Sequence, residues 1–234
     1  MPLPTIDSPT YTLTLPISKR KISYRPFRVK EEKILMIAAE SGDLNTIYQA
    51  IQQVVLSCTN ETLNIFQESS VDSEYALISL RSSSVGETMK PNLVCSHCNE
   101  SASVKVTSGD LVIDEDKSID NKIKISENLV IELKYPSFAD EVKNGTLQDE
   151  VDMVFDSVCT AIDKIYFDDE IFDTEDYKQD ELEEFIDNLN AEVFTQIVEY
   201  IKTKPTVKIP IEFVCPHCKK KNDQLLEGME SFFG

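Results

Sequence analysis

"LVCSHC" at residues 93–98 and "FVCPHC" at residues 213–218 are the two stretches that most constrain how this chain folds. Each has two apolar residues, typical of a strand end, followed by Cys-x-His-Cys, and together they hold four of the six cysteines. A Cys-x-x-Cys turn offers two thiolates to one tetrahedral metal ion, and Zn²⁺ favours four sulfur ligands. We therefore expect one structural zinc ion per chain. Its predicted ligands are Cys95, Cys98, Cys215 and Cys218.

The distance between the two cysteine pairs is unusual. Zinc ribbons commonly separate their pairs by about 15–20 residues, whereas 116 residues lie between Cys98 and Cys215. The pattern therefore indicates a zinc-ribbon-like module with a large insertion, in which the ion fastens the end of the chain to its middle. Two alternatives stay open. In the first, each pair would be a redox dithiol, although no βαβ pattern surrounds either pair. In the second, each pair would bind its own metal together with His97 or His217, although histidines inside such a turn tend to point outward.

The sequence offers no recognisable catalytic group. His97 and His217 are the only histidines, so no Ser–His or Cys–His pair exists away from the predicted metal. We find no glycine-rich phosphate loop and no His-Glu-x-x-His motif, and a four-cysteine zinc site has no open position for substrate. We therefore expect a protein without enzymatic activity.

The charge of the chain excludes several partners. A net charge of −19 repels nucleic-acid phosphates and anionic lipids. No apolar run reaches the roughly 18 residues that a membrane helix needs, and the N-terminus lacks the pattern of a secretory signal. We therefore expect a cytosolic protein that neither binds nucleic acid nor inserts into a membrane. Residues 163–187 hold twelve acidic residues and two lysines, which we interpret as a solvated helix face plus loop; a nucleic-acid mimic or a surface for a basic partner is the alternative.

The first ninety residues predict a hairpin followed by helices. "TYTLTLP" at 10–16 and "KISYRPF" at 21–27 alternate apolar and polar residues as half-buried strands do. A helix is expected over 29–41, ending at Gly42, and Asp43 is placed to cap a second helix whose apolar stripe includes Cys58. A weaker third helix is expected from Asp72, before a serine-rich linker at 81–91.

The rest of the chain predicts short strands and then helices. Four short strands are expected between residues 102 and 136. A helical apolar stripe follows from Leu147 through Ile162 to Ile165 with Cys159 at its margin, and shorter helices are expected over 180–201. A final strand at 206–214 leads into the second cysteine pair. The fold class is therefore α+β. We expect a hairpin and helical region at 1–90 and a zinc-tied β region at 91–234, with a helical insertion at about 137–205.

The closing segment "LLEGMESFF" at 225–233 is apolar, although chain ends are usually polar and frayed. These side chains either pack on this protein's own zinc module or anchor a partner, because buried aromatic residues are common interface hot spots. The candidate partner-binding residues are Leu225, Met229, Phe232 and Phe233.

Three segments of the sequence resemble the baseplate hub assembly proteins of T-even-like contractile-tailed bacteriophages. They are "LPISKRKISYRPFRVKEEKILMIAAES" at 15–41, "PNLVCSHC" at 91–98 and "IPIEFVCPHCKKKNDQLLEGMESFF" at 209–233. The interval 101–205 carries no motif of the family. The four predicted zinc ligands fall on the knuckle cysteines of that family.

The resemblance implies a late phage protein that helps to assemble the tail baseplate hub. It would act as an assembly factor or chaperone in the host cytoplasm, with hub subunits and the tape-measure protein as partners. The first alternative is a permanent hub subunit located in the virion tail baseplate. The second alternative is an acidic host-directed binding protein or nucleic-acid mimic.

Overall fold

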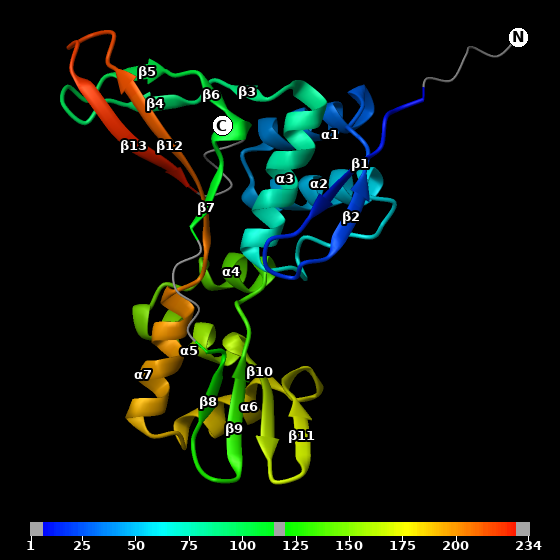
Figure 1. Ribbon diagram of the computed structural model, residues 1–234, viewed down its shortest axis with the longest axis vertical. Helices are drawn as coiled ribbons and strands as arrows, with labels where there is room; N and C mark the ends of the chain where they lie inside the picture. Colours follow the sequence, from blue (N-terminus) through cyan, green and yellow to red (C-terminus); the bar gives the residue numbers. More distant parts are fainter. Residues whose placement is uncertain (1–6, 115–119, 228–234) are drawn as a thin grey trace, which may run out of the picture. The chain divides into compact units, whose positions relative to one another are not determined.

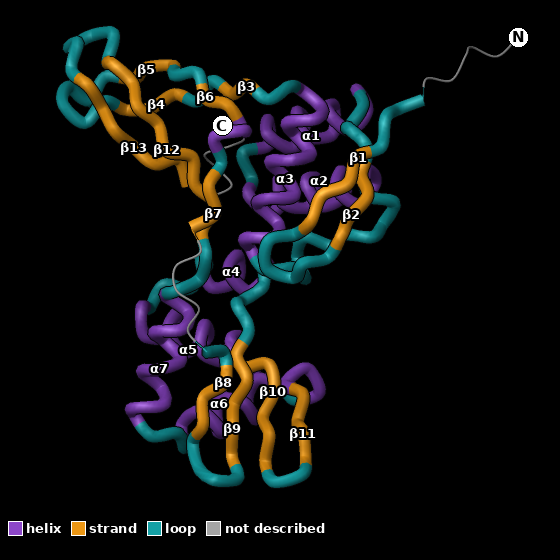
Figure 2. The backbone as a smooth tube through the Cα atoms, viewed as in Figure 1, coloured by secondary structure: helices purple, strands orange, loops and turns teal. Residues whose placement is uncertain are grey.

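The computed structural model describes residues 7–114 and 120–227 and shows an α+β protein of helices and small antiparallel sheets (Figures 1 and 2). The chain forms two compact units. Unit 1 contains residues 1–114 and 206–234, and unit 2 contains residues 115–205. The sequence pattern instead predicts a boundary at residue 90 and an insertion at about 137–205. None of the helices in the described ranges is long and apolar enough to cross a membrane.

Unit 1 begins with the predicted hairpin. Strands β1 (Tyr11–Thr14) and β2 (Lys21–Tyr24) pair antiparallel, with Leu13 opposite Ile22. Both of these side chains are buried, and Leu15 just after β1 is fully buried. The alternation of apolar and polar residues in this stretch therefore reflects a hairpin with one buried face.

The next two helices also follow the prediction. Helix α1 spans Val29–Ser41, and Gly42 ends it with a left-handed φ of 66°. Helix α2 spans Leu44–Cys58, and the Asp43 side chain accepts a hydrogen bond from the Thr46 backbone N–H. Cys58 is buried, as expected for a packing residue.

Helix α3 (Ser70–Val85) is longer than the sequence predicts. The expected linker at 81–91 is wrong for its first five residues, which continue the helix. Serine hydroxyls stabilise this last turn locally, since Ser83 and Ser84 both donate to the carbonyl of Leu80. Ser84 also accepts a hydrogen bond from the Phe27 backbone N–H, which ties the end of the helix to the segment after the hairpin.

The β module of unit 1 is built around one long strand. Strand β12 (Thr206–Val214) pairs with β13 (Lys221–Glu227) on one side and with β7 (Val112–Asp114) on the other. Two short antiparallel pairs complete the module. Strand β4 (Asn92–Val94) pairs with β5 (Ser101–Ser103), and β3 (Thr88–Met89) pairs with β6 (Val106–Thr107). The 3₁₀ turn η1 (Ser108–Asp110) follows β6. Alternate residues of β12 point into a core that also contains Val71 and Ile78 of α3. They are Val207, Ile209, Ile211 and Phe213.

Unit 2 is a four-stranded antiparallel sheet with helices packed on one face (Figure 1). The strands lie in the order β11 (Glu170–Asp173), β10 (Ile162–Phe167), β9 (Leu129–Leu133) and β8 (Lys122–Lys124). The helices are α4 (Phe138–Asn144), α5 (Glu150–Ala161), α6 (Gln179–Asp187) and α7 (Ala191–Lys202), with the 3₁₀ turn η2 (Thr174–Asp176) before α6. Ile131 and Leu133 of β9 pack against residues of α5, α6 and α7, including Ile197.

The predicted helical stripe through Ile162 and Ile165 is wrong. Helix α5 ends at Ala161, and Ile162 already has the extended backbone of a strand. Strand β10 pairs on both edges, with Ile165 opposite Ile131 of β9 and opposite Phe172 of β11. These pairings satisfy the backbone groups of β10 and override the apparent helical period. The insertion is therefore not purely helical, and the acidic stretch 163–187 runs through a hairpin and a 3₁₀ turn before it reaches α6.

Candidate metal centre

The two cysteine pairs lie in hairpin loops with the same backbone geometry. Residues 95–100 join β4 to β5, and residues 215–220 join β12 to β13. In the first loop, the Cys95 N–H donates to the Glu100 carbonyl at 3.0 Å and the Asn99 N–H to the Cys95 carbonyl at 2.9 Å. In the second loop, the Cys215 N–H donates to the Lys220 carbonyl at 2.9 Å and the Lys219 N–H to the Cys215 carbonyl at 3.0 Å.

The residue after the second cysteine is left-handed in both loops, with φ of 59° at Asn99 and 62° at Lys219. This conformation costs about 1–2 kcal/mol in an L-residue other than glycine, and asparagine tolerates it best. The repeated letters in the sequence therefore correspond to a repeated turn, which directs both cysteines of each pair to the same side.

The two loops bring the four cysteine sulfurs together. All four Sγ atoms lie within 4.8 Å of one another. The Sγ atoms of Cys95 and Cys218 are 3.7 Å apart, and so are those of Cys98 and Cys215. A disulfide requires about 2.05 Å, whereas a tetrahedron with Zn–S bonds of about 2.3 Å has edges of about 3.8 Å. The arrangement is therefore compatible with a four-sulfur metal site, and its close contacts run between the two loops.

The backbone of the first loop favours a thiolate at Cys95. Burial raises the pKa of this thiol, but hydrogen bonds from the backbone N–H groups of His97 and Cys98 and from the Asn222 side chain outweigh burial, so that the pKa falls to about 6. At Cys98, the Glu100 backbone N–H lowers the pKa, while burial and the neighbouring sulfurs raise it to about 12. One negative charge in a cluster of sulfurs disfavours the next, and a bound cation removes that conflict.

Asn222 is a site residue that the sequence patterns did not reveal. It lies on β13, four positions after Cys218, and is 2% exposed. Its Oδ1 accepts hydrogen bonds from the backbone N–H and the hydroxyl of Ser96, both at 3.0 Å, and its Nδ2 donates to the Lys220 carbonyl. Asn222 therefore fastens the first loop to the second. The one sequence feature that pointed to Asn222 is its position in the strand, where it shares a face with Leu226, which is also buried.

The two histidines lie outside the sulfur cluster. His97 and His217 are both exposed, and His97 Nε2 lies 3.2 Å from the Lys221 carbonyl oxygen. Cys95 and Cys215 are fully buried, while Cys98 and Cys218 are partly buried. This placement favours a shared four-sulfur site over two separate sites that would each use a histidine.

The remaining cysteines and the closing segment lie elsewhere. Cys58 and Cys159 are buried, and burial raises the pKa of each thiol to about 11, which fits packing residues better than reactive thiols. Leu225 on β13 is 56% exposed. The other three candidate partner-binding residues lie outside the residues that the structure describes. They are Met229, Phe232 and Phe233.

Comparison with known proteins identifies one relative and one family, each of which matches almost the whole chain. The baseplate hub assembly protein gp26 of Enterobacteria phage T4 is 25% identical over 230 residues, which cover 95% of this chain and 97% of that protein. No solved structure matches. The model of the family described as T4 bacteriophage base plate protein matches residues 8–234, which include both cysteine pairs and unit 2. The chain therefore belongs to the T4 bacteriophage base plate protein family.

Proposed function

We propose that this protein is a baseplate hub assembly factor that acts by binding other tail proteins and catalyses no reaction. The observation that carries this proposal is the family match over residues 8–234, together with a relative named as a baseplate hub assembly protein that aligns over 97% of its own length. The partners would be hub subunits or the tape-measure protein, and the host cytoplasm would be the place of action.

A structural zinc ion forms part of this proposal. Cys95, Cys98, Cys215 and Cys218 would hold it, and it would supply a closed cross-link. The observation in support is the 3.7 Å spacing of sulfurs from two hairpins that are far apart in sequence. Such an ion would join the β4–β5 hairpin to the β12–β13 hairpin and complete the core that contains Cys95 and Cys215. In this proposal the module resembles a zinc ribbon that has accepted unit 2 as an insertion.

A phage that lacks this gene tests the assembly role. We expect infected cells to accumulate tail proteins without completed hubs, and a plasmid copy of the gene to restore them. Electron microscopy of the lysate measures the outcome. Normal baseplates in the absence of the gene would refute the proposal.

Quantitative mass spectrometry of purified virions separates the assembly factor from a permanent hub subunit. An assembly factor should be present at far less than one copy per tail. A hub subunit should be present at a fixed whole number of copies per tail. The infected cell serves as the control, since the protein should be abundant there in both cases.

A further inference from the structure

Helix α1 carries a stripe of exposed side chains, three of which are apolar. Val29, Met36 and Ile37 are 79%, 61% and 58% exposed, and Lys33 and Glu40 are also exposed. These five positions follow the spacing of three and four residues that places side chains on one face of a helix. The ion pairs described on α1 involve Lys30 and Glu31, not Lys33 or Glu40.

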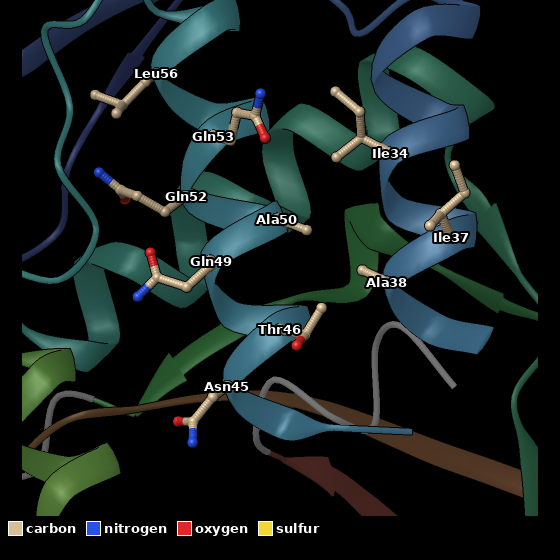
Figure 3. Close-up of a pocket in the computed structure, with 10 residues that line it drawn as sticks. All are labelled: Ile34, Ile37, Ala38, Asn45, Thr46, Gln49, Ala50, Gln52, Gln53 and Leu56. Carbon is tan, nitrogen blue, oxygen red and sulfur yellow. The ribbon is translucent and has the colours of Figure 1, made fainter. Parts of the chain in front are cut away.

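The surface beside this stripe is unusually free of charge. Helix α2 has fifteen residues and none of them is charged, although 28% of the whole chain is charged. A groove of about 750 Å³ runs between α1 and α2, and no charged residue lines it. Figure 3 shows this groove, with Ile34, Ile37 and Ala38 on α1 and the amides of Gln49 and Gln53 on α2. Depletion of charge is the compositional mark of an interface core.

The order of residues along the stripe is self-complementary. Met36 and Ile37 form its centre. Lys33 and Glu40 lie equally far from that centre on either side, about 10 Å apart along the helix axis. An antiparallel copy of α1 therefore meets Met36 and Ile37 with the same two residues and each lysine with a glutamate.

From this symmetry we infer that a second copy of this chain covers the stripe, with α1 packed antiparallel against α1 of the partner in a two-fold dimer. In this arrangement Met36 and Ile37 of the two copies meet at the axis, and Lys33 of each copy pairs with Glu40 of the other. A two-fold interface uses the same surface on both subunits and must be self-complementary. The neutral groove beside α1 then receives apolar side chains from the partner helix.

The overall charge of the chain supports the choice of this face. Two copies that each carry −19 repel each other over most of their surfaces. The exposed residues of α1 include Lys30 and Lys33 and, with opposite charge, Glu32 and Glu40. Two copies can therefore meet along this helix without net repulsion. The two lysine–glutamate pairs fix how the two helices align along their axes and add little to the affinity, because exposed ion pairs are individually weak.

Charge exchange across the axis tests the dimer. Sedimentation equilibrium of the full-length protein should show a reversible dimer. Glu40→Lys places two lysines opposite each other at both ends of the axis, and Lys33→Glu does the same with two glutamates. Each change should raise the dimer dissociation constant about tenfold or more. The double variant Lys33→Glu with Glu40→Lys restores opposite charges and should return the constant close to that of the wild type.

A matched control removes the effect of net charge. Asp223→Lys changes an exposed residue on β13 and alters the net charge as Glu40→Lys does, so it should leave the dimer intact. Circular dichroism of each variant confirms that the fold is unchanged. The inference is overturned if the wild type is a monomer, if Glu40→Lys dimerises like the wild type, or if the double variant fails to regain the dimer.

Discussion

At the scale of single residues, two buried polar side chains hold segments together that are distant in sequence. Asn222 joins the two cysteine loops, and Glu31 joins helix α1 to the end of the hairpin and to helix α2. Glu31 is 1% exposed and accepts hydrogen bonds from the Arg25 guanidinium, the Arg28 backbone N–H and the Ser57 hydroxyl. A buried carboxylate is tolerated only when it is paired in this way.

Asn222→Ala should lower the free energy of unfolding by about 1–2 kcal/mol, because it removes a buried side chain that accepts two part-buried hydrogen bonds from Ser96. Urea unfolding followed by circular dichroism measures the change. The exposed neighbour Asp223 is the control, and Asp223→Ala should change stability by about 0.5 kcal/mol or less. Equal effects of the two substitutions would show that the amide does not fasten the loops.

Glu31→Gln should lower the free energy of unfolding by about 3 kcal/mol at neutral pH, since it leaves Arg25 without its buried carboxylate. Burial raises the pKa of Glu31, but the hydrogen bonds from Arg25, Arg28, Ser57 and Lys30 lower it to about 2, well below the ordinary value of 4.5. The stability that ionised Glu31 contributes is therefore fully present above about pH 4.5 and is lost as the pH falls toward 2.

Chemical denaturation of the wild type and Glu31→Gln at several pH values tests the sign. The difference in stability should be constant above about pH 5 and should shrink steadily below it. Glu32→Gln, on an exposed neighbour, should show little difference at any pH. A difference that grows toward acidic pH would contradict the pairing described here.

At the scale of elements, the acidic stretch is distributed over several structures and not over one helix face. The β10–β11 hairpin turns at Asp168, which has a left-handed φ of 51° and whose backbone N–H donates to the Asn128 carbonyl. The carboxylates of this turn, on Asp168, Asp169 and Glu170, are exposed to solvent. By contrast, Thr174 is buried, and its hydroxyl donates to the Ile162 and Asp163 carbonyls. Thr174 therefore fixes the end of this hairpin from within, while Asp173 accepts a hydrogen bond from the Glu175 backbone N–H and Lys134 pairs with Asp163 and Glu175.

We therefore predict that the acidic turn is dispensable for folding. Asp168→Asn, Asp169→Asn and Glu170→Gln should each change the free energy of unfolding by about 0.5 kcal/mol or less. Asparagine also tolerates the left-handed backbone at 168. Thr174→Val serves as the contrast and should lower stability by about 1–2 kcal/mol. If the triple amide variant folds normally but fails to complement a phage without the gene, this turn is a binding surface.

At the scale of the whole molecule, the four cysteine sulfurs lie within 4.8 Å of one another although the two pairs are far apart in sequence. The β12–β13 hairpin brings the last part of unit 1 back to β4 and β5 after unit 2 has been inserted between them in sequence. Closing so long a loop costs chain entropy, and the proposed metal cross-link would offset this cost. Zinc binding contributes roughly 10–16 kcal/mol in small folding sites, which is comparable with the stability of a whole domain.

Purified protein should contain one zinc ion per chain, and Cys215→Ser should lose it and unfold several kcal/mol more easily. Elemental analysis and urea unfolding measure the two effects. Cys58→Ser is the matched control, because this thiol lies outside the cluster, and it should keep the metal. Zinc that persists when Cys95 and Cys98 are both changed to serine would rule out a shared site.

Local signals in the sequence predicted several elements correctly and singled out the two cysteine pairs. The hairpin at 11–24, helices α1 and α2 with Gly42 and Asp43 at their ends, and strand β12 were readable because their signals are local, namely period, caps and turns. The paired Cys-x-x-Cys turns were readable for the same reason, since each fixes its own backbone. A resemblance at both ends and in the middle also sufficed to predict the family.

Long-range contacts in the folded chain selected between competing local patterns and brought distant residues together. Ile162 and Ile165 fit a helical period as well as a strand, and pairing with β9 and β11 selected the strand. The serine-rich composition of 81–91 suggested a linker, yet contacts such as that of Ser84 with Phe27 extended α3. The role of Asn222 could not be predicted, because its place on the buried face of β13 does not show that its partner is Ser96, which lies 126 positions away in sequence. Such contacts depend on the folded path of the chain, and no local pattern encodes them.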